Sequence, residues 1–259
     1  MKLIYFFISI LIYLLFWCVF SYLLVFLGGP FISSYLPILS LLKTVDSGPV
    51  LLALPAIPAA VANALLILAF GVQHSVMARS GFKDVIARVV PDCLERSVYV
   101  LATCLVLIWV YLAWQPMPAA IWAITGWGAR LLEITFLSGA GLVLWSTFMI
   151  SHSQLFGVRQ TWNSLLERPA DGEAFITPSL YKFSRHPMYL GMLIVFWATP
   201  VMTTGHFVAS ALFSIYIFIG IGYEERDLLA KFGDAYREYI DHVPQIFPIG
   251  GKKLPHQEK

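Results

Sequence analysis

The sequence predicts an all-α membrane protein, a polytopic bundle of five to six transmembrane helices that ends in a helical hairpin and an amphipathic helix. Composition is the first reason, because 59% of the 259 residues are hydrophobic and only 12% are charged. The mean hydropathy of +0.76 is far above that of soluble domains. The second reason is that the apolar residues form uncharged runs close to the ~20 residues that cross a bilayer.

Six apolar runs are candidate crossings, at 3–27, 50–72, 97–113, 131–150, 187–204 and 207–223. The first exceeds the ~7–15 residues of a secretory signal core, so we expect it to be retained as a span. Pro55 and Pro58 predict that the second run kinks or begins late, near residue 59. Only Gly205 and His206 separate the last two runs, which predicts a tight helical hairpin.

The basic residues test this arrangement independently. With six spans, 15 of the 17 Lys and Arg residues fall on one side, and only Lys43 and Arg130 fall on the other. Because Lys and Arg concentrate on the cytoplasmic side of membrane proteins, this distribution gives the orientation. We expect an integral protein of a bacterial-type inner membrane, with both termini and the active site cytoplasmic.

Charge and cysteine content limit the partners. The net charge is only +2 and no basic run is long enough for a nucleic-acid groove, so nucleic acid is excluded as a partner. The lipid bilayer is the expected surrounding, and no feature indicates a required protein partner. Cys18, Cys93 and Cys104 lack CxxC spacing and are interpreted as packing residues.

An amphipathic helix is predicted after the last apolar run. Apolar side chains recur there at three- and four-residue intervals, at Leu228, Leu229, Phe232, Tyr236, Tyr239 and Ile240. This spacing places them on one face of a helix that lies at the membrane surface. Gly233 is expected to break or bend it.

Arg185, His186 and Pro187 open the fifth run. Proline favours the first turn of a helix, so Arg185 and His186 should lie at a helix N-terminus. The free N–H groups, the helix dipole and a guanidinium together favour an anionic group such as a carboxylate. The alternative is that Arg185 extends to the lipid headgroups and His186 caps the helix.

Glu224 and Glu225 end the sixth run. If the last two runs form a hairpin, these carboxylates return beside Arg185 and His186. There a glutamate can pair with the arginine or accept hydrogen bonds from a ribose or an amine. Simple termination of the span by charge is the alternative interpretation.

His74 and His152 follow the second and fourth runs, and the predicted topology brings both to the same face. Ionisable residues at span ends indicate function, although such histidines also serve as helix-end hydrogen bonders. No cysteine or carboxylate accompanies them at a recognised ligand spacing, so no metal site is predicted.

Five motifs together resemble the isoprenylcysteine carboxyl methyltransferase superfamily and, within it, the membrane methanethiol S-methyltransferases. In chain order they are Gln73-His74-Ser75, the block from His152 to Trp162, Arg185-His186-Pro187 with Tyr189 and Gly191, Glu224-Glu225, and Phe232-Gly233 with Tyr236 and Tyr239. The resemblance covers about residues 59–248. Each motif is common alone, and the combination is specific.

The resemblance implies transfer of a methyl group from S-adenosylmethionine to methanethiol, a small volatile thiol, which gives dimethyl sulfide and S-adenosylhomocysteine. The residues implied for the cofactor are Arg185, His186, Pro187, Tyr189, Gly191, Glu224, Glu225 and Tyr236. Those implied for the substrate are Gln73, Gln154, Gln160 and Trp162. His152 or His74 would deprotonate the thiol, and Arg159 would favour the anion.

We expect a single transmembrane methyltransferase domain over residues 1–259. It divides into an N-terminal span and outer segment (1–58), an acceptor-side core (59–180), an S-adenosylmethionine-binding region (181–248) and a polar tail (249–259). Two other functions stay open. One is methylation of a prenyl-cysteine carboxylate or a lipid amine, and the other is the role of a non-enzymatic, denitrification-linked membrane protein of the same fold.

Overall fold

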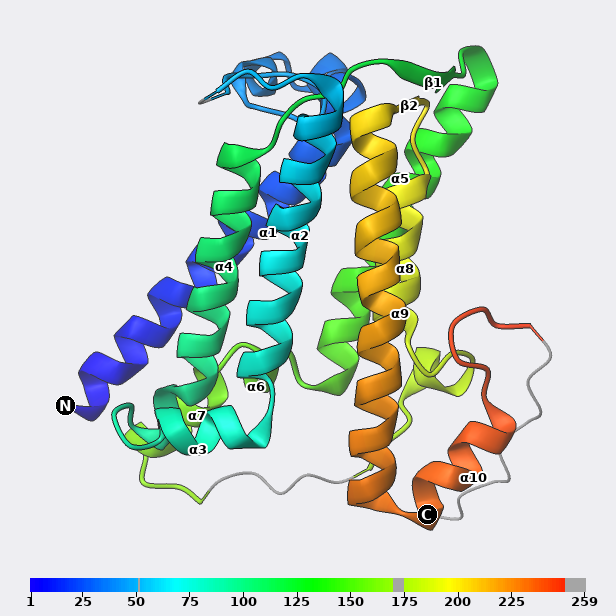
Figure 1. The fold of residues 1–259 in the computed structure, drawn as a ribbon. Helices are drawn as coiled ribbons and strands as arrows, with labels where there is room; N and C mark the ends of the chain where they lie inside the picture. The colour runs from blue at the N-terminus through cyan, green and yellow to red at the C-terminus, as the bar shows by residue number, and fades with distance from the viewer. Residues whose placement is uncertain (51, 170–174, 250–259) are drawn as a thin grey trace.

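The computed structural model describes residues 1–50, 52–169 and 175–249. Among these residues, five helices are long and apolar enough to cross a membrane. They are α1 (Lys2–Tyr35), α2 (Ala56–Met77), α4 (Glu95–Ala113), α5 (Gly126–Ile150) and α9 (Thr204–Phe232), drawn in Figure 1. The chain is thus a polytopic helical membrane protein, as predicted. Residues 250–259 of the predicted polar tail lie outside the described residues.

The fifth apolar run does not form a full crossing. Its helix α8 (Pro187–Trp197) has 11 residues, too few for a bilayer core of about 30 Å at about 1.5 Å per residue. The predicted turn at Gly205 and His206 is wrong, because both lie in the first turn of α9. The chain instead turns through the segment 198–203, where Pro200 cannot continue a helix and the Thr203 side chain caps α9.

A two-stranded antiparallel ribbon lies at this end of the bundle, which the all-α prediction did not include. It pairs β1 (Ala120–Ala123) with β2 (Val201–Thr203). Figure 1 shows it at the upper end, beside the start of α9. The strands are too short to give an alternating pattern in the sequence, which is why the sequence did not predict them.

Hydrogen bonds from buried polar side chains close the same end. The Thr203 hydroxyl donates to the carboxylate of Asp46 and accepts from the backbone N–H of His206 at 3.0 Å. Asn63 of α2 exchanges two hydrogen bonds with the backbone of Gln115, both 2.8 Å long. These bonds satisfy groups that would otherwise be buried without partners.

Replacing Thr203 with valine is expected to lower stability by about 1–3 kcal/mol, because it removes the cap of α9 and the donor to Asp46 at once. Thermal unfolding in detergent measures the change. Thr203→Ser keeps the hydroxyl and should unfold close to the wild-type temperature. Equal losses for the two variants would contradict the hydrogen-bonding role.

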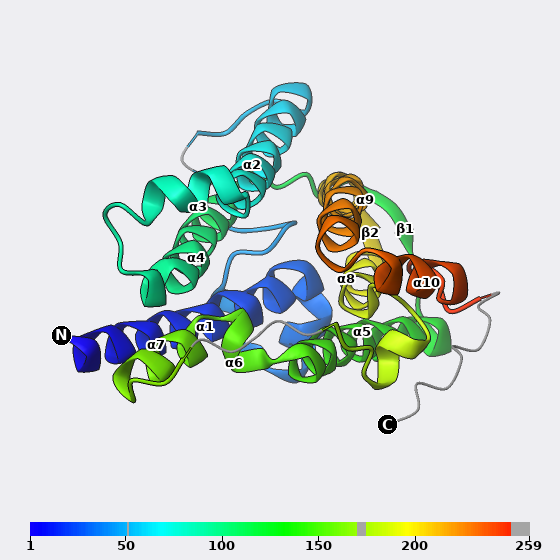
Figure 2. The ribbon, with the colours of Figure 1, turned by 90° about the horizontal axis from the view of Figure 1, so that it is seen from below.

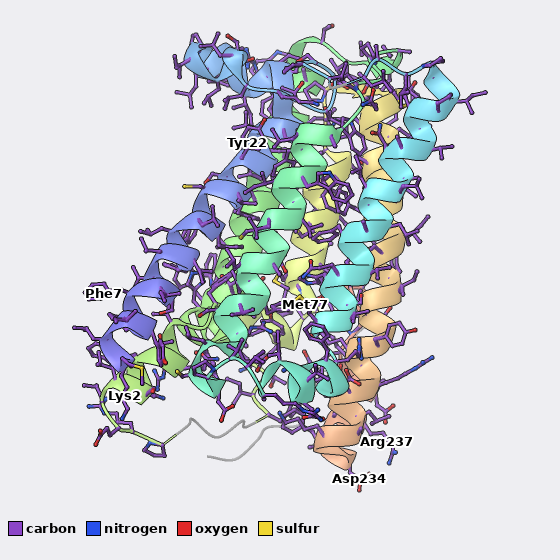
Figure 3. All side chains as sticks on the ribbon, turned by 60° about the vertical axis from the view of Figure 1, so that its left-hand side comes forward. Lys2, Phe7, Tyr22, Met77, Asp234 and Arg237 are labelled. Carbon is purple, nitrogen blue, oxygen red and sulfur yellow. The ribbon has the colours of Figure 1, made fainter. Side chains whose placement is uncertain are left out.

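The short helices gather at the opposite end. Figure 1 shows α3 (Ser80–Ile86), α6 (His152–Leu155), α7 (Val158–Leu165) and α10 (Asp234–His242) there, together with the N-terminus. In Figure 3 the charged side chains of Lys2, Asp234 and Arg237 lie at the same end. The N-terminus and the predicted motifs therefore share one face of the bundle.

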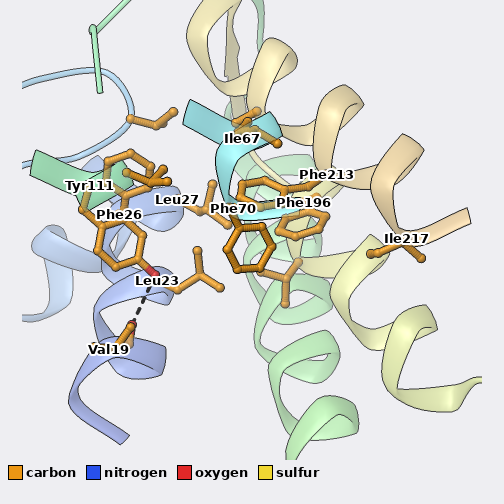
Figure 4. Close-up of a cluster of buried hydrophobic side chains, with 14 of the residues drawn as sticks. Val19, Leu23, Phe26, Leu27, Ile67, Phe70, Tyr111, Phe196, Phe213 and Ile217 are labelled. Atoms are coloured by element: carbon orange, nitrogen blue, oxygen red, sulfur yellow. Dashed lines mark hydrogen bonds between the residues drawn. The ribbon is translucent and has the colours of Figure 1, made fainter. Parts of the chain in front are cut away.

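Two pairs of helices meet in the core. Seen from below in Figure 2, α2 lies beside α4 and α8 lies beside α9, and contacts between α2 and α9 join the pairs. Figure 4 shows the junction, where Phe70 of α2 meets Phe213 of α9 at a ring-centroid separation of 5.6 Å. Large apolar side chains on the outer faces stay exposed, as expected for surfaces that contact lipid.

The predicted amphipathic helix is present in two parts. Helix α9 continues through Glu224 to Phe232, and α10 begins after Gly233, whose φ is 56°. Tyr236, Tyr239 and Val243 form a small buried cluster of their own, against which Phe175, Leu228, Leu229, Phe232 and Ile240 pack. The break at Gly233 and the apolar face are thus confirmed.

Candidate active site

Arg185 and Glu225 form a buried ion pair where α8 begins beside α9. Arg185 Nε donates to Glu225 Oε1 at 2.8 Å, and the two side chains are 9% and 17% exposed. His186 Nε2 lies 3.1 Å from the same oxygen, and the Gln245 amide donates to Glu225 Oε2 at 3.1 Å. A carboxylate held by three partners is a fixed part of the structure.

The same arginine holds the segment that follows α10. Its Nη1 donates to the carbonyls of Ile240 at 3.2 Å and Val243 at 2.6 Å. The backbone N–H groups of Arg185 and His186 donate to the carbonyls of Pro244 and Gln245 at 2.9 and 3.0 Å. This segment therefore closes over the N-terminus of α8. Arg185 is engaged with protein groups rather than projecting to the lipid headgroups.

Glu224 differs from its neighbour. Its side chain is 44% exposed, and its Oε2 accepts a hydrogen bond of 2.9 Å from the Tyr189 phenol. The nearest His186 nitrogen is 3.9 Å away, beyond hydrogen-bonding distance. Glu224 thus offers oxygen acceptors at the edge of the network, whereas Glu225 is fixed inside it.

Three other residues predicted to bind the cofactor, Pro187, Gly191 and Tyr236, have roles in the packing around this network. Pro187 is the first residue of α8, as expected. Gly191 lies against α5, and a Cβ on it would come within 2.7 Å of the Gly139 carbonyl oxygen, so glycine allows α5 and α8 to approach closely. Tyr236 is 1% exposed in its cluster with Tyr239 and Val243, where burial raises its pKa.

His74 belongs to a hydrogen-bonded chain with Thr103 and Tyr99. We assign the hydrogen of Thr103 Oγ1 to the carbonyl of Tyr99, 3.0 Å away, which makes this hydroxyl the acceptor for His74 Nδ1 at 3.2 Å. The proton of the neutral ring is then on Nδ1. His74 Nε2 is left to accept from the Tyr99 phenol at 2.7 Å.

His152 belongs to a similar chain on another side of the bundle. Its Nδ1 lies 2.8 Å from Thr147 Oγ1, and its Nε2 lies 2.8 Å from the Tyr13 phenol of α1. The ring stacks on Phe148, with centroids 4.1 Å apart, and a second ring, that of Phe156, lies 4.8 Å away. Among the described residues, the hydrogen-bond and ring partners of His152 come from α1, α5 and Phe156 and not from the network of Arg185 and Glu225.

The stability of the protein is expected to fall as pH drops below the ordinary His pKa of 6.5, because burial lowers the pKa of His152. The unfolded chain takes up the proton first, so the stabilisation is complete above that value and is lost between it and the lowered pKa. Thermal unfolding from about pH 8 to about pH 5 measures this. His152→Gln should show a shallower decline, and parallel curves would contradict the account.

The remaining predicted residues lie on α2, α6 and α7. Gln73 donates to the sulfur of Met77 at 3.0 Å, and Gln160 donates to the carbonyl of Gln154 at 2.9 Å. The carbonyl oxygens of the Gln73 and Gln160 side chains are buried without a partner among the described residues. Arg159 is exposed on α7, and Trp162 contacts Phe6 with ring centroids 5.2 Å apart.

Comparison with known proteins gives the family. The family model described as phospholipid methyltransferase matches residues 132–235. The chain is 46% identical to methanethiol S-methyltransferase from Pseudomonas deceptionensis over 80% of this chain and 78% of that protein. It is 40% identical to the Mycobacterium tuberculosis enzyme of that name over 91% of this chain and 92% of the relative.

The chain belongs to the methanethiol S-methyltransferase family. It is a methyltransferase and an integral membrane protein, and its family implies a methyl donor. No solved structure matches the chain significantly.

Two phenols of this methyltransferase that bond its histidines, Tyr99 and Tyr13, were not predicted as site residues. A signal was present in one case, because Tyr99 and Thr103 lie one helical turn apart at the start of an apolar run. Polar groups in such runs are candidates for function. Tyr13 carries no comparable signal, since its partner His152 is 139 residues away in the chain.

Proposed function

We propose that the protein methylates methanethiol with S-adenosylmethionine as donor, giving dimethyl sulfide and S-adenosylhomocysteine. The observation that carries this is that one helix, α9, joins two groups: its Glu224 carboxylate is accessible and bonded to the Tyr189 phenol, and the ring of its Tyr216 lies 6.3 Å from that of His74, which is paired with Tyr99. The Glu224 side is suited to the polar methyl donor, and the His74 side is suited to the thiol that accepts the methyl group. The names of the relatives supply the acceptor.

The residues around Glu224 fit the proposed donor. A hydroxyl or ammonium group of S-adenosylmethionine can donate to the carboxylate of Glu224, which is 44% exposed. Arg185, His186 and Glu225 position this site through their fixed network, and Pro187 starts the helix that carries Tyr189. Tyr236 packs in one cluster with Val243, whose carbonyl Arg185 holds, and Gly191 allows α8 to approach α5 closely.

S-adenosylmethionine supplies a methyl group on a sulfonium. The protein has to align the thiol sulfur with that methyl group and remove the thiol proton. We assign the final acceptance of the thiol proton to His74, because its Nε2 is the basic nitrogen of the ring and is bonded to the Tyr99 phenol. His152 then serves to hold α1 against α5. Gln73, Gln154, Gln160, Trp162 and Arg159 are proposed for the acceptor side.

The site is proposed to face the cytoplasm. The N-terminus and α3, α6, α7 and α10 lie at that face, where the six-span prediction puts 15 of the 17 Lys and Arg residues, and such an excess of positive charge favours the cytoplasmic side. A small apolar thiol can reach the bundle through the lipid, and the polar donor can reach Glu224 from water. We propose a single domain in which both meet.

Gas chromatography of the headspace tests the acceptor. Membranes that contain the protein, given S-adenosylmethionine and methanethiol, should release dimethyl sulfide, and membranes without it should not. The phospholipid methyltransferase match to residues 132–235 makes a lipid amine the second acceptor to assay, beside a farnesylated cysteine. Methylation of either one without dimethyl sulfide would contradict the proposal.

A further inference from the structure

We propose that Tyr99 is the residue that takes the proton from the thiol, and that His74 acts through it. This inference rests on the proposed function and adds to it a catalytic residue that the motifs did not include. The phenol of Tyr99, not the imidazole, is the group that would contact the acceptor sulfur.

The direction of the hydrogen bonds supports this role. Because Thr103 fixes the proton of His74 on Nδ1, the hydrogen of the Tyr99 hydroxyl points at His74 Nε2, 2.7 Å away. The lone pairs of the phenol oxygen are then available to accept a hydrogen bond from S–H. Both ring nitrogens of His74 are already bonded within the protein, so a thiol would have to displace Tyr99 to reach the imidazole directly.

The surroundings of Tyr99 place it on the donor side. It lies within electrostatic range of Glu224 and Tyr216, and Tyr189 lies within range of Tyr99, Tyr216 and Glu224. The ring of Tyr216 also lies edge-on to that of His74, with centroids 6.3 Å apart, so the His74–Tyr99 pair faces the helix that carries Glu224. Tyr99 is only 9% exposed, so water competes little for the phenol.

A cation lies against the same phenol. The Arg96 guanidinium is 4.9 Å from the centre of the Tyr99 ring, and its Nε donates to the carbonyl of Leu155 at 2.7 Å. A fixed positive charge at this distance favours negative charge that develops on the phenol oxygen or the thiol sulfur. Arg96 therefore helps to stabilise the anionic nucleophile.

The S–H proton moves to the Tyr99 oxygen while the Tyr99 proton moves to His74 Nε2. The electron pair left on sulfur forms the new bond to the methyl carbon. The old bond from that carbon to the sulfonium breaks, its pair stays with the donor sulfur, and both sulfur products are neutral thioethers. His74 passes the proton on to water, because burial and the Arg96 charge beside it disfavour a lasting imidazolium.

The chain contains a matched control. Tyr13 donates to His152 in the same Thr–His–Tyr order, with a bond of 2.8 Å, but its neighbours are Trp17 and Phe156 rather than Glu224. Tyr13→Phe and Tyr99→Phe each remove one buried hydroxyl from such a chain. A difference between the two variants therefore reports position relative to the donor rather than loss of a hydroxyl.

Tyr99→Phe should reduce the rate of methanethiol methylation about 100-fold, with unchanged S-adenosylmethionine affinity by calorimetry. The loss should shrink for trifluoroethanethiol, whose fluorines make its proton easier to remove, since a more acidic thiol needs the base less. Tyr13→Phe should stay near the wild-type rate. Thr103→Val, which frees the His74 proton from Nδ1, should also lose less activity with trifluoroethanethiol than with methanethiol, but the difference should be smaller. This variant replaces Tyr99→Phe in the test if Tyr99→Phe does not fold.

Equal losses with the two thiols would overturn the proposal, and so would a loss in Tyr13→Phe as large as in Tyr99→Phe. Failure of the proposed function gives a different result, because the wild-type protein would then methylate neither thiol.

Discussion

Glu225→Ala is expected to lower the stability of the protein by about 3–5 kcal/mol, because it leaves the buried Arg185 guanidinium without its carboxylate. The change also removes the acceptor of His186 and Gln245. These bonds join the start of α8 to the segment after α10. We therefore expect that segment to detach and methylation to be lost with it.

Thermal unfolding in detergent and limited trypsin digestion measure this result. The variant should unfold at a lower temperature and be cleaved faster after Arg237 of α10. Asp234→Ala is the control, because its ion pair with Arg237 is exposed, at 95% and 64%, and such a pair contributes at most about 1 kcal/mol. A similar small change for both variants would show that the buried pair does not hold the segment.

Glu224→Gln should leave the stability near that of the wild type and weaken S-adenosylmethionine binding about 10- to 100-fold. The reason is that the substitution removes charge-assisted hydrogen bonds to S-adenosylmethionine, which are worth about 1.5–3 kcal/mol. Among the described residues of the network, no other carboxylate is exposed and able to take the place of Glu224. Its protein partner, the Tyr189 phenol, can still donate to the amide oxygen.

Isothermal titration calorimetry in detergent measures the affinity. Asp227→Asn provides the matched control, since Asp227 lies one turn further along α9 and pairs with Arg79 at 2.8 Å. Its affinity should equal that of the wild type. If Glu224→Gln binds the donor as tightly as Asp227→Asn does, Glu224 is not a donor ligand.

The helical membrane fold could be predicted because an apolar segment inside a bilayer has to satisfy its backbone hydrogen bonds internally, as a helix does. Uncharged runs of sufficient length predicted every long helix, and the break at Gly233 followed from a glycine within an amphipathic pattern. The length of α8 was not predictable from the charge pattern alone, since residues 198–204 are uncharged and continue the run, although they contain Pro200. The extended segment there depends on pairing with β1, which lies far away in the sequence.

The parts of the candidate site that belong to sequence motifs could be predicted. The approach of Arg185 and His186 to Glu225 followed from the expected return of the chain, even though the turn was misplaced. The different positions of Glu224 and Glu225 were not, because adjacent residues of a helix point in directions about 100° apart and only packing decides which one is buried. The pairing of His74 with Tyr99 likewise depends on how α2 packs against α4.

Transfer of a deuterated methyl group tests the central claim most directly. Membranes that contain the wild-type protein are given methanethiol and S-adenosylmethionine with a fully deuterated methyl group, and the released gas is analysed by mass spectrometry. We predict dimethyl sulfide in which one methyl group is fully deuterated, at a rate that Glu224→Gln reduces. Unlabelled dimethyl sulfide, or none above the level of membranes without the protein, would contradict the account.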